Sequence, residues 1–290
     1  MRFKQIVIGV DFSQNSRQAL REAMRLQQDN HTGLVAVHII EQMVVDELVK
    51  HANMTADSVR LQSEQCLRRW ITEVAGQGHA VLGEAVIASP FEGLMHAVDR
   101  HHADLLILGS RGREADTGHP GAVASKCIRK APVPVMLVRR KHEGPFKRVV
   151  ACIEISDPSR VVLDFAVAVA ASAAATCEAL HVHAPISFGD LAFDPFPPGD
   201  ALRIEESRDS VARAGFDAFM ADRAASGVTP VFRVASGVTD AIIDYLLETD
   251  ADLAVLGTRG RTGLRAFLLG TTAERLVHES PCSILVVKET

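Results

Sequence analysis

The chain has 290 residues, which is the length of about two domains of ordinary size. Its 31 basic and 36 acidic residues give a net charge of −5, and hydrophobic residues make up 47% of the chain. This composition excludes a wholly disordered protein, and the acidic balance argues against a dedicated nucleic-acid-binding protein. The longest uncharged run, residues 165–177, falls short of the roughly 18 residues of a membrane span, so we expect a buried Ala-rich helix and no span.

Strand-like and helix-like segments alternate along the first half. Residues 6–10 form a short apolar run typical of a buried strand, and helical spacing follows over residues 13–29. The other strands predicted in this half are residues 34–40, 80–87, 105–109 and 133–138, and the other helices are residues 56–75, residues 91–101 and the stretch that ends at Lys130. Five strands separated by helices predict a doubly wound parallel sheet that is covered on both faces.

The second half repeats the first. Residues 103–113, ADLLILGSRGR, recur as ADLAVLGTRGR at residues 251–261, and residues 3–17 match residues 146–160. Order is kept throughout, so one unit is present twice. We therefore predict domains over residues 1–140 and 149–290, joined by a linker over residues 141–148.

Charge and cysteine usage give two further expectations. Residues 1–142 hold 18 basic and 15 acidic residues, a balance of +3, whereas residues 143–290 hold 13 and 21, a balance of −8. The five cysteines are odd in number and widely spaced, which is typical of buried, reduced thiols in a cytoplasmic protein.

Polar and glycine residues follow two strands of each unit. The first strand leads into Asp11 in one half and Glu154 in the other. The fourth strand leads into a glycine-rich loop, which in the second half reads Gly257-x2-Gly260-x9-Gly270 and is followed by Thr271 and Thr272. Ligands of open α/β sheets bind beyond the carboxyl ends of the strands. Glycines let backbone N–H groups approach phosphate oxygens, and the start of a helix favours an anion, so this pattern predicts a nucleotide site.

Together these features resemble the universal stress protein family. The resemblance rests on the carboxylate-x-Ser after each first strand, the His near the end of each second strand, followed by Val in the second half, and the G-x2-G-x9-G-[ST] loop, and it covers essentially the whole chain. It is a resemblance to tandem members, and it implies two doubly wound five-stranded parallel-sheet domains of strand order 3-2-1-4-5, of the adenine-nucleotide alpha-hydrolase-like type. It also implies a cytoplasmic, stress-linked role, ATP binding in members that carry the loop, and pairing of the two domains through their last strands.

Carried over residue by residue, the resemblance favours the second half as the nucleotide site. It implies cofactor contacts at Glu154, Val182, Gly257, Arg259, Gly260, Gly270, Thr271 and Thr272, with the backbone of Val182 against the adenine. Four arginines accompany this loop: Arg259, Arg261, Arg265 and Arg275. Glu154 departs from the family's usual Asp, and its extra methylene moves the carboxylate by about a bond length, a large shift for a hydrogen bond.

The first half departs from the pattern in its loop. Asp11 matches, but the loop reads Gly109-x2-Gly112-x8-Gly121, one spacer residue short, and neither of the next two residues carries a hydroxyl. Glu114 and Asp116 add negative charge that disfavours a polyphosphate. We expect ATP, or ADP or AMP, to bind mainly in the second half and only weakly or not at all in the first.

We expect a regulatory nucleotide-binding protein rather than a dedicated enzyme, because no catalytic constellation and no metal-ligand set can be assembled from spacing. Two alternatives stay open: a slow ATPase or phosphotransferase, and an interaction scaffold whose pocket is vestigial or takes an apolar ligand. Asp11 and Glu154 could instead cap the helices that follow them, and either glycine loop could be a simple turn. We read His181 and His183 as structural rather than as a metal pair.

Residues 185–200 hold three phenylalanines among four prolines, unlike their counterpart, residues 41–57. This segment is either a loop packed on its own domain or a lid, an apolar-ligand site or a partner surface. The expected partners are an adenine nucleotide, the other domain of the chain, a second copy of the chain and an unknown protein.

Overall fold

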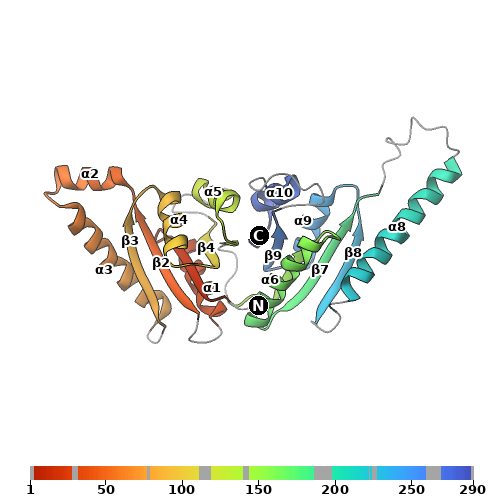
Figure 1. The fold of residues 1–290 in the computed structure, drawn as a ribbon, viewed down its shortest axis with the longest axis horizontal. Helices are drawn as coiled ribbons and strands as arrows, with labels where there is room; N and C mark the ends of the chain where they lie inside the picture. The colour runs from red at the N-terminus through yellow and green to blue at the C-terminus, as the bar shows by residue number, and fades with distance from the viewer. Residues whose placement is uncertain are drawn as a thin grey trace.

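The computed structural model describes residues 3–27, 32–76, 79–110, 119–139, 144–185, 198–221, 223, 227–258 and 269–288. The strands are β1 (Gln5–Val10), β2 (Gly33–Ile40), β3 (Val81–Ile87), β4 (Leu105–Gly109), β5 (Val135–Val138), β6 (Arg148–Cys152), β7 (Thr176–His183), β8 (Val228–Val234), β9 (Leu253–Gly257) and β10 (Ser283–Val287). They form a single sheet in the order β3-β2-β1-β4-β5-β10-β9-β6-β7-β8 (Figure 1).

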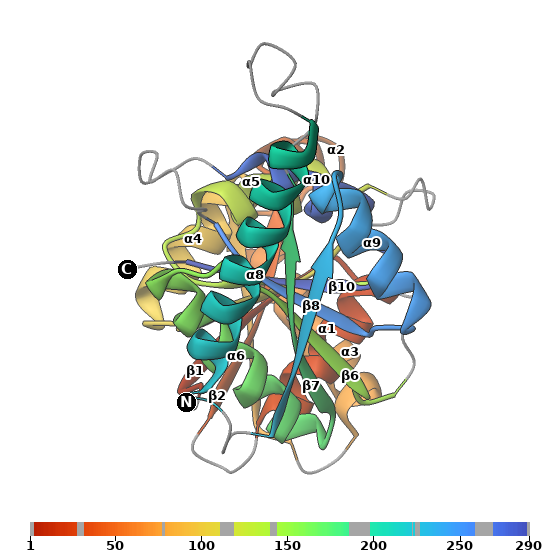
Figure 2. The ribbon, with the colours of Figure 1, turned by 90° about the vertical axis from the view of Figure 1, so that its right-hand side faces the viewer.

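Each half of this sheet is parallel and doubly wound. The order β3-β2-β1-β4-β5 in the first half is repeated as β8-β7-β6-β9-β10 in the second, which confirms the predicted fold class and the strand order 3-2-1-4-5. The sheet twists strongly along its width, so that β10 runs at a steep angle to β8 when the molecule is viewed from its β8 end (Figure 2).

The helices cover both faces of the sheet. They are α1 (Gln14–Leu26), α2 (Gln42–His51), α3 (Ala56–Ala75), α4 (Pro90–Arg100), α5 (Ala122–Lys130), α6 (Asp157–Ala173), α8 (Pro198–Ala221), α9 (Val238–Glu248) and α10 (Thr271–Glu279). One apolar core packs α1, α3, α6 and α8 against one face, and the other packs α4, α5, α9 and α10 against the opposite face. Each core runs through both halves, so the two halves share their hydrophobic interior.

The halves join through their last strands, as predicted. β5 and β10 pair antiparallel, with Ile284 opposite Leu137 and Leu285 opposite Met136, and all four side chains are buried. Two basic residues that occupy matching places tie the halves further. Arg139, after β5, donates to the carbonyls of Val277 (3.4 Å) and His278 (3.5 Å) at the end of α10, and Lys288, after β10, donates to the carbonyl of Ile128 at the end of α5.

Most predicted elements appear with small shifts of their ends, and three differ. The Ala-rich helix ends at Ala173 rather than at residue 177, because Ala174 adopts a left-handed conformation and Cys177 belongs to β7. Helix α2 was not predicted; Val45 on its inner side packs on Val59 of α3, while Met43 is 70% exposed. Within the expected linker, Phe146 is buried and Arg148 is the first residue of β6.

Glu22 is an acidic side chain buried in the shared core. It is 1% exposed on α1, while its counterpart in the repeat is the buried Phe165. Burial raises the pKa of Glu22 to about 7, and the nearby charge of Asp252 adds to this effect, although the ion pair with Arg25 opposes it. The folded chain therefore binds more protons than the unfolded chain between about pH 4.5 and 7.

We predict that Glu22→Gln removes a loss of stability that the native chain suffers as pH rises through this window. Because the raised pKa penalises the ionised form, the variant should gain up to about 3 kcal/mol of unfolding free energy relative to the native chain between pH 4.5 and pH 8. Urea unfolding at a series of pH values measures this. Glu73→Gln, at a carboxylate that is 67% exposed, is the matched control, and equal pH slopes for all three proteins would contradict the prediction.

Candidate functional site

The described site residues gather at the carboxyl ends of neighbouring strands. In the first half β1 pairs with β4, so Asp11, which follows β1, lies near Gly109, which ends β4. β6 pairs with β9 in the same way, which places Glu154 near Gly257 in the second half. Both positions lie where the strand order reverses, the usual ligand position in such sheets. Gly112, Arg259 and Gly260 lie outside the described residues, as do Arg261, Arg265, Glu114 and Asp116.

The last glycine of each loop begins a helix in the same way in both halves. Gly121 is the N-cap of α5 and Gly270 is the N-cap of α10, with backbone angles that differ by no more than a few degrees (φ −63° and −62°, ψ 159° and 153°). The N–H of Gly121 donates to the Ser110 carbonyl at 2.9 Å, and that of Gly270 donates to the Thr258 carbonyl at 3.1 Å. The shorter loop of the first half thus closes on the same hydrogen bond as the full-length loop.

The glycines differ in the space around them. A Cβ atom at Gly109 would lie 2.8 Å from the backbone carbon of Asn15 and 2.9 Å from the nitrogen of Ser16, because the start of α1 packs directly on this strand end. Among the described residues, the atom nearest to a Cβ at Gly270 is the Thr258 carbonyl oxygen at 3.8 Å, and none lies within 4 Å of one at Gly121. Gly109 is therefore needed for packing, whereas no described residue crowds the N-cap glycines.

The two acids near the first strand ends take different positions. Asp11 is half-buried, and its carboxylate accepts the N–H of Ser13 at 3.0 Å. Glu154 is exposed, and its own N–H donates to the hydroxyl of Ser159 at 3.1 Å. The N-caps of α1 and α6 are Ser13 and Ser156, so neither acid caps the following helix itself. Asp11 instead stabilises the turn that leads into α1.

The histidines of the second strands tie neighbouring strands together. The Nδ1 of His38 lies 2.8 Å from the Val10 carbonyl, and the Nδ1 of His181 lies 2.9 Å from the Ile153 carbonyl, so the repeat preserves this contact. His183 pairs with Asp209 of α8, with 3.2 Å between Nε2 and Oδ1. Within the described residues no group of three or more His, Cys, Asp or Glu side chains could hold a metal ion.

Val182 lies between His181 and His183 on β7. Its side chain is buried in the core on the opposite face of the sheet. The backbone of Val182 is therefore what this position offers to a ligand at the strand end.

Of the four arginines near the second-half loop, Arg275 already pairs with acidic side chains. Arg275 pairs with Asp240 of α9 at 2.5 Å and with Glu279 at 2.9 Å. The hydrogen bond from Arg275 lowers the pKa of Asp240, so this ion pair stays charged over a wide pH range. In the first half the ammonium of Lys126 lies 4.4 Å from the ring centre of Phe91.

Two other expectations meet the structure only in part. Four cysteines are buried or half-buried as free thiols, but Cys66 is exposed on α3, contrary to the expectation of buried thiols. Of the Phe/Pro segment, residues 186–197 lie outside the described residues, and residues 198–200 form the start of α8. Among the described helices, none combines the length and the hydrophobicity that crossing a membrane requires.

Comparison with known proteins places this fold in a family. The family model described as "Universal stress protein family" matches residues 2–139 and again residues 145–288. The chain belongs to the universal stress protein family. The double match agrees with a tandem arrangement of two family units.

Individual relatives support the same conclusion. "Universal stress protein E homolog" of Haemophilus influenzae is 24% identical over 312 residues, which cover 99% of this chain and 98% of the relative. "Universal stress protein A homolog 1" of Coxiella burnetii is 32% identical over 147 residues, which cover 49% of this chain and 96% of the relative. This chain therefore resembles one relative over its full length and a smaller relative over half of it.

Solved structures share the fold. A protein of unknown function from Pseudomonas aeruginosa PAO1 superposes with a TM-score of 0.72 at 18% identity, covering 99% of this chain and 92% of the other. A universal stress protein from Archaeoglobus fulgidus gives a TM-score of 0.62 at 20% identity, covering 99% of both chains. These likenesses confirm a two-domain α/β fold of this family.

The contrast between the glycines gives a stability prediction. Gly109→Ala should lower the unfolding free energy by about 1–3 kcal/mol, because its Cβ must push against the backbone of α1. Gly270→Ala should change it by no more than about 1 kcal/mol, the cost of a poorer N-cap residue. Chemical denaturation of the two variants measures both values, and a Gly109→Ala protein as stable as the Gly270→Ala protein would show that α1 does not need this close approach.

Proposed function

We propose that this protein is a stress-response regulator that binds an adenine nucleotide in its C-terminal half, with ATP as the favoured ligand. We take the halves as residues 1–140 and 149–290, joined by residues 141–148. The observation that carries the proposal is the start of α10, where Gly270 caps the helix and no described residue comes closer than 3.8 Å to the position of a Cβ. That arrangement is what a phosphate group needs to approach backbone N–H groups closely.

The groups around the start of α10 suit a phosphate chain. The N–H groups of the first helical turn have no carbonyl partner within the helix, and they carry the positive end of the helix dipole. The hydroxyls of Thr271 and Thr272 stand at the same turn, and Thr271 is exposed. Glu154 and the backbone of Val182 lie at the ends of the neighbouring strands β6 and β7, where they could contact the ribose and the adenine.

The first half offers the same backbone with fewer ligand groups. Gly121 caps α5 with the geometry of Gly270, so we attribute its weaker binding to the side chains and not to the loop closure. Ala122 and Val123 replace the two threonines, which removes both hydroxyls from the turn. Asp11 matches the family's usual acid, whereas Glu154 does not. The carboxylate of Asp11, however, accepts the N–H of Ser13 and stabilises the turn into α1.

Substitution of the two N-cap glycines tests the proposal. We predict that Gly270→Val lowers ATP affinity at least about tenfold, because the isopropyl group fills the space above the helix start, while Gly121→Val leaves the affinity unchanged. Neither position meets a close atom in the described part of the chain, so both variants should fold. Calorimetric titration of ATP, ADP and AMP into the full chain gives the affinities, and thermal unfolding without nucleotide checks the fold.

Three results would contradict the proposal: full ATP affinity in Gly270→Val, loss of affinity in Gly121→Val, or no binding of any of the three nucleotides to the native chain at millimolar concentration. Phosphate release in the same samples separates binding from turnover. Release above background that is lost in Gly270→Val would favour the slow ATPase or phosphotransferase instead.

A further inference from the structure

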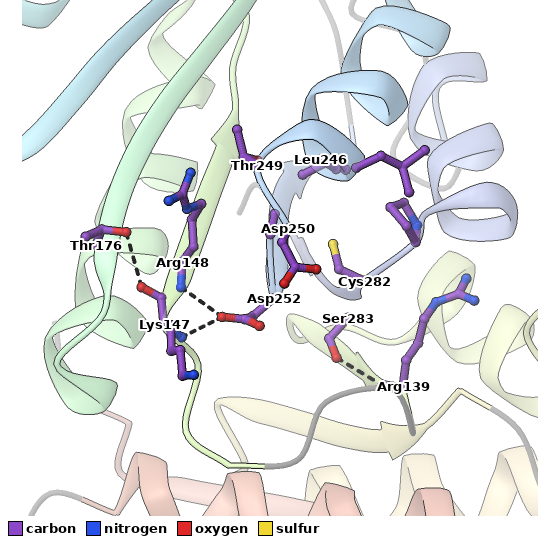
Figure 3. Close-up of a pocket in the computed structure, with 13 residues that line it drawn as sticks. Arg139, Lys147, Arg148, Thr176, Leu246, Thr249, Asp250, Asp252, Cys282 and Ser283 are labelled. Carbon is purple, nitrogen blue, oxygen red and sulfur yellow. Dashed lines mark hydrogen bonds between the residues drawn. The ribbon is translucent and has the colours of Figure 1, made fainter.

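A cavity lies at the end of the second-half sheet where the strands begin, opposite the end with the proposed nucleotide site (Figure 3). Its volume is about 580 Å³, within the roughly 300–1,000 Å³ of small-molecule sites. It is lined by the starts of β6, β7, β9 and β10, by the end of α9, and by Arg139 of the first half. Its described lining contains neither acid of the proposed nucleotide site and no described residue of the glycine loop, so it would be a separate site.

Hydrogen bonds hold the wall of this cavity in place. The carboxylate of Asp252 accepts the N–H of Lys147 at 2.6 Å and that of Arg148 at 2.9 Å, and the hydroxyl of Thr176 donates to the Lys147 carbonyl at 3.1 Å (Figure 3). The N–H of Arg139 donates to the hydroxyl of Ser283 at 3.1 Å, which ties the first half to the same wall. The cavity is thus preformed and is complete only when both halves are present.

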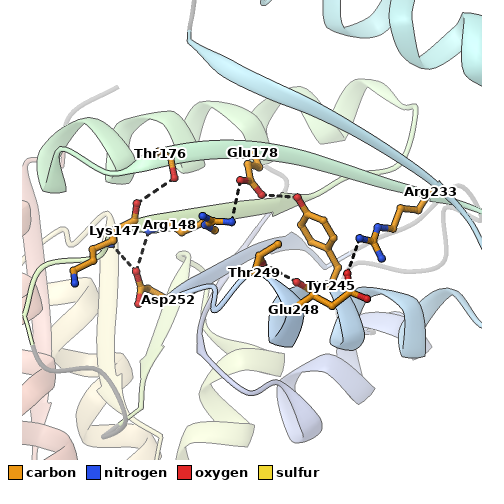
Figure 4. Close-up of polar contacts among 9 residues, drawn as sticks. All are labelled: Lys147, Arg148, Thr176, Glu178, Arg233, Tyr245, Glu248, Thr249 and Asp252. Atoms are coloured by element: carbon orange, nitrogen blue, oxygen red, sulfur yellow. Dashed lines mark hydrogen bonds and ion pairs between the residues drawn. The ribbon is translucent and has the colours of Figure 1, made fainter.

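Several of the charged groups are already compensated. The guanidinium of Arg148 lies 3.5 Å from the carboxylate of Glu178, which also accepts the hydroxyl of Tyr245 at 2.6 Å (Figure 4). That bond and burial raise the pKa of Tyr245 to about 12, so the tyrosine stays a proton donor. The guanidinium of Arg139 reaches the last carbonyls of α10.

Two exposed and opposite charges remain on the lining. In the described part of the chain, the ammonium of Lys147 and the carboxylate of Asp250 have no hydrogen bond or ion pair with another side chain. Asp250 follows the carboxyl end of α9, where the helix dipole also favours a positive group. Lys147 supplies positive charge where β6 begins, while Arg139 lies across the cavity from it with its guanidinium on the carbonyls of α10 (Figure 3).

Apolar side chains complete the lining. Leu246 and Cys282 are buried, and Pro281 lies beside Cys282. Leu247 is 55% exposed at the cavity, so its contact with a ligand would remove apolar surface from water.

Comparison of the two halves distinguishes contacts that both halves share from groups that only the second half contributes. In the first half Asp104 holds the start of β1 as Asp252 holds that of β6, with the N–H of Lys4 at 2.7 Å and that of Gln5 at 3.3 Å. The residues that match Arg148, Asp250 and Ser283 are Gln5, His102 and Pro134, so these three polar groups of the cavity are not repeated in the first half.

We propose that this cavity binds a small zwitterion with an apolar side chain, an amino acid or a short peptide. The ammonium of the ligand lies beside Asp250 and the end of α9, its carboxylate lies beside Lys147, and its side chain packs on Leu247 and Pro281. A polyanion would meet Asp250 and Asp252, and a polycation would meet three basic residues, so a ligand with both charges suits this lining best.

The experiment uses the dipeptide L-leucyl-L-leucine as probe and the full chain as receptor. Calorimetric titration should show saturable binding, and amide NMR signals of Arg148, Ala251 and Ser283 should shift with it. N-acetyl-leucyl-leucine lacks the ammonium and leucyl-leucinamide lacks the carboxylate, so each should bind at least about fivefold more weakly. Asp250→Asn should weaken the dipeptide to the same extent and leave the N-acetyl compound unaffected.

Lys147→Gln provides the complementary test and Lys4→Gln its matched control. Lys147→Gln should weaken the dipeptide about fivefold and leave the amide compound unaffected, whereas Lys4→Gln, at the matching place in the first half, should change nothing. The proposal is overturned if the dipeptide shows no saturable binding up to about 10 mM, where a ligand of even millimolar affinity would register. It is also overturned if both blocked compounds bind as well as the dipeptide, or if the shifted signals lie elsewhere.

Discussion

The antiparallel pairing of β5 with β10 is the contact on which the architecture depends. Each of these strands is apolar and ends its unit, so alone it would leave an open edge with unpaired backbone groups. Their pairing merges two five-stranded sheets into one and lets both hydrophobic cores run through the seam. It also brings α5 and α10 together, with the rings of His119 and His278 5.7 Å apart (Figure 1).

The same pairing explains why each half depends on the other for its helix ends. A helix that stops inside a protein leaves carbonyl groups without partners, and a basic side chain satisfies them best. Here Arg139 of the first half serves α10 and Lys288 of the second half serves α5. Burial lowers the pKa of Lys288 to about 8, which shows how closely the two halves enclose this side chain.

Repetition made much of the fold predictable. Because each unit shows the same alternation of apolar runs and helical spacing, two doubly wound parallel sheets could be expected from the amino-acid sequence. The strand order and the pairing of residues 133–138 with 283–287 were implied by the resemblance to the family. Helix α2 escaped prediction because its short stretch carries exposed apolar residues such as Met43 and Val44, which blur the helical pattern. The end of α6 depends on Ala174, which adopts a left-handed conformation. Alanine rarely adopts this conformation, so the sequence gives no sign of it.

The candidate site was predictable where spacing carries the chemistry. The loop pattern identified Gly270 and Thr271, but the close packing of Gly109 on α1 depends on a tertiary contact that spacing does not reveal. The same holds for Arg275, whose charge is compensated by Asp240 from another helix. The cavity at the strand starts escaped prediction entirely, since Arg139, Thr176 and Asp250 are far apart in the chain and follow no motif.

Covalent linkage of the two units has a consequence for their assembly. A unit on its own chain could cover its last strand only by meeting a second copy, at a rate set by protein concentration. Here the two strands belong to one molecule, so they meet at an effective concentration of about millimolar whatever the abundance of the protein. The partner is also always the same: the half with the complete loop is never exchanged for another copy of itself. Every molecule therefore contains one complete loop and one shorter loop, in a constant one-to-one ratio.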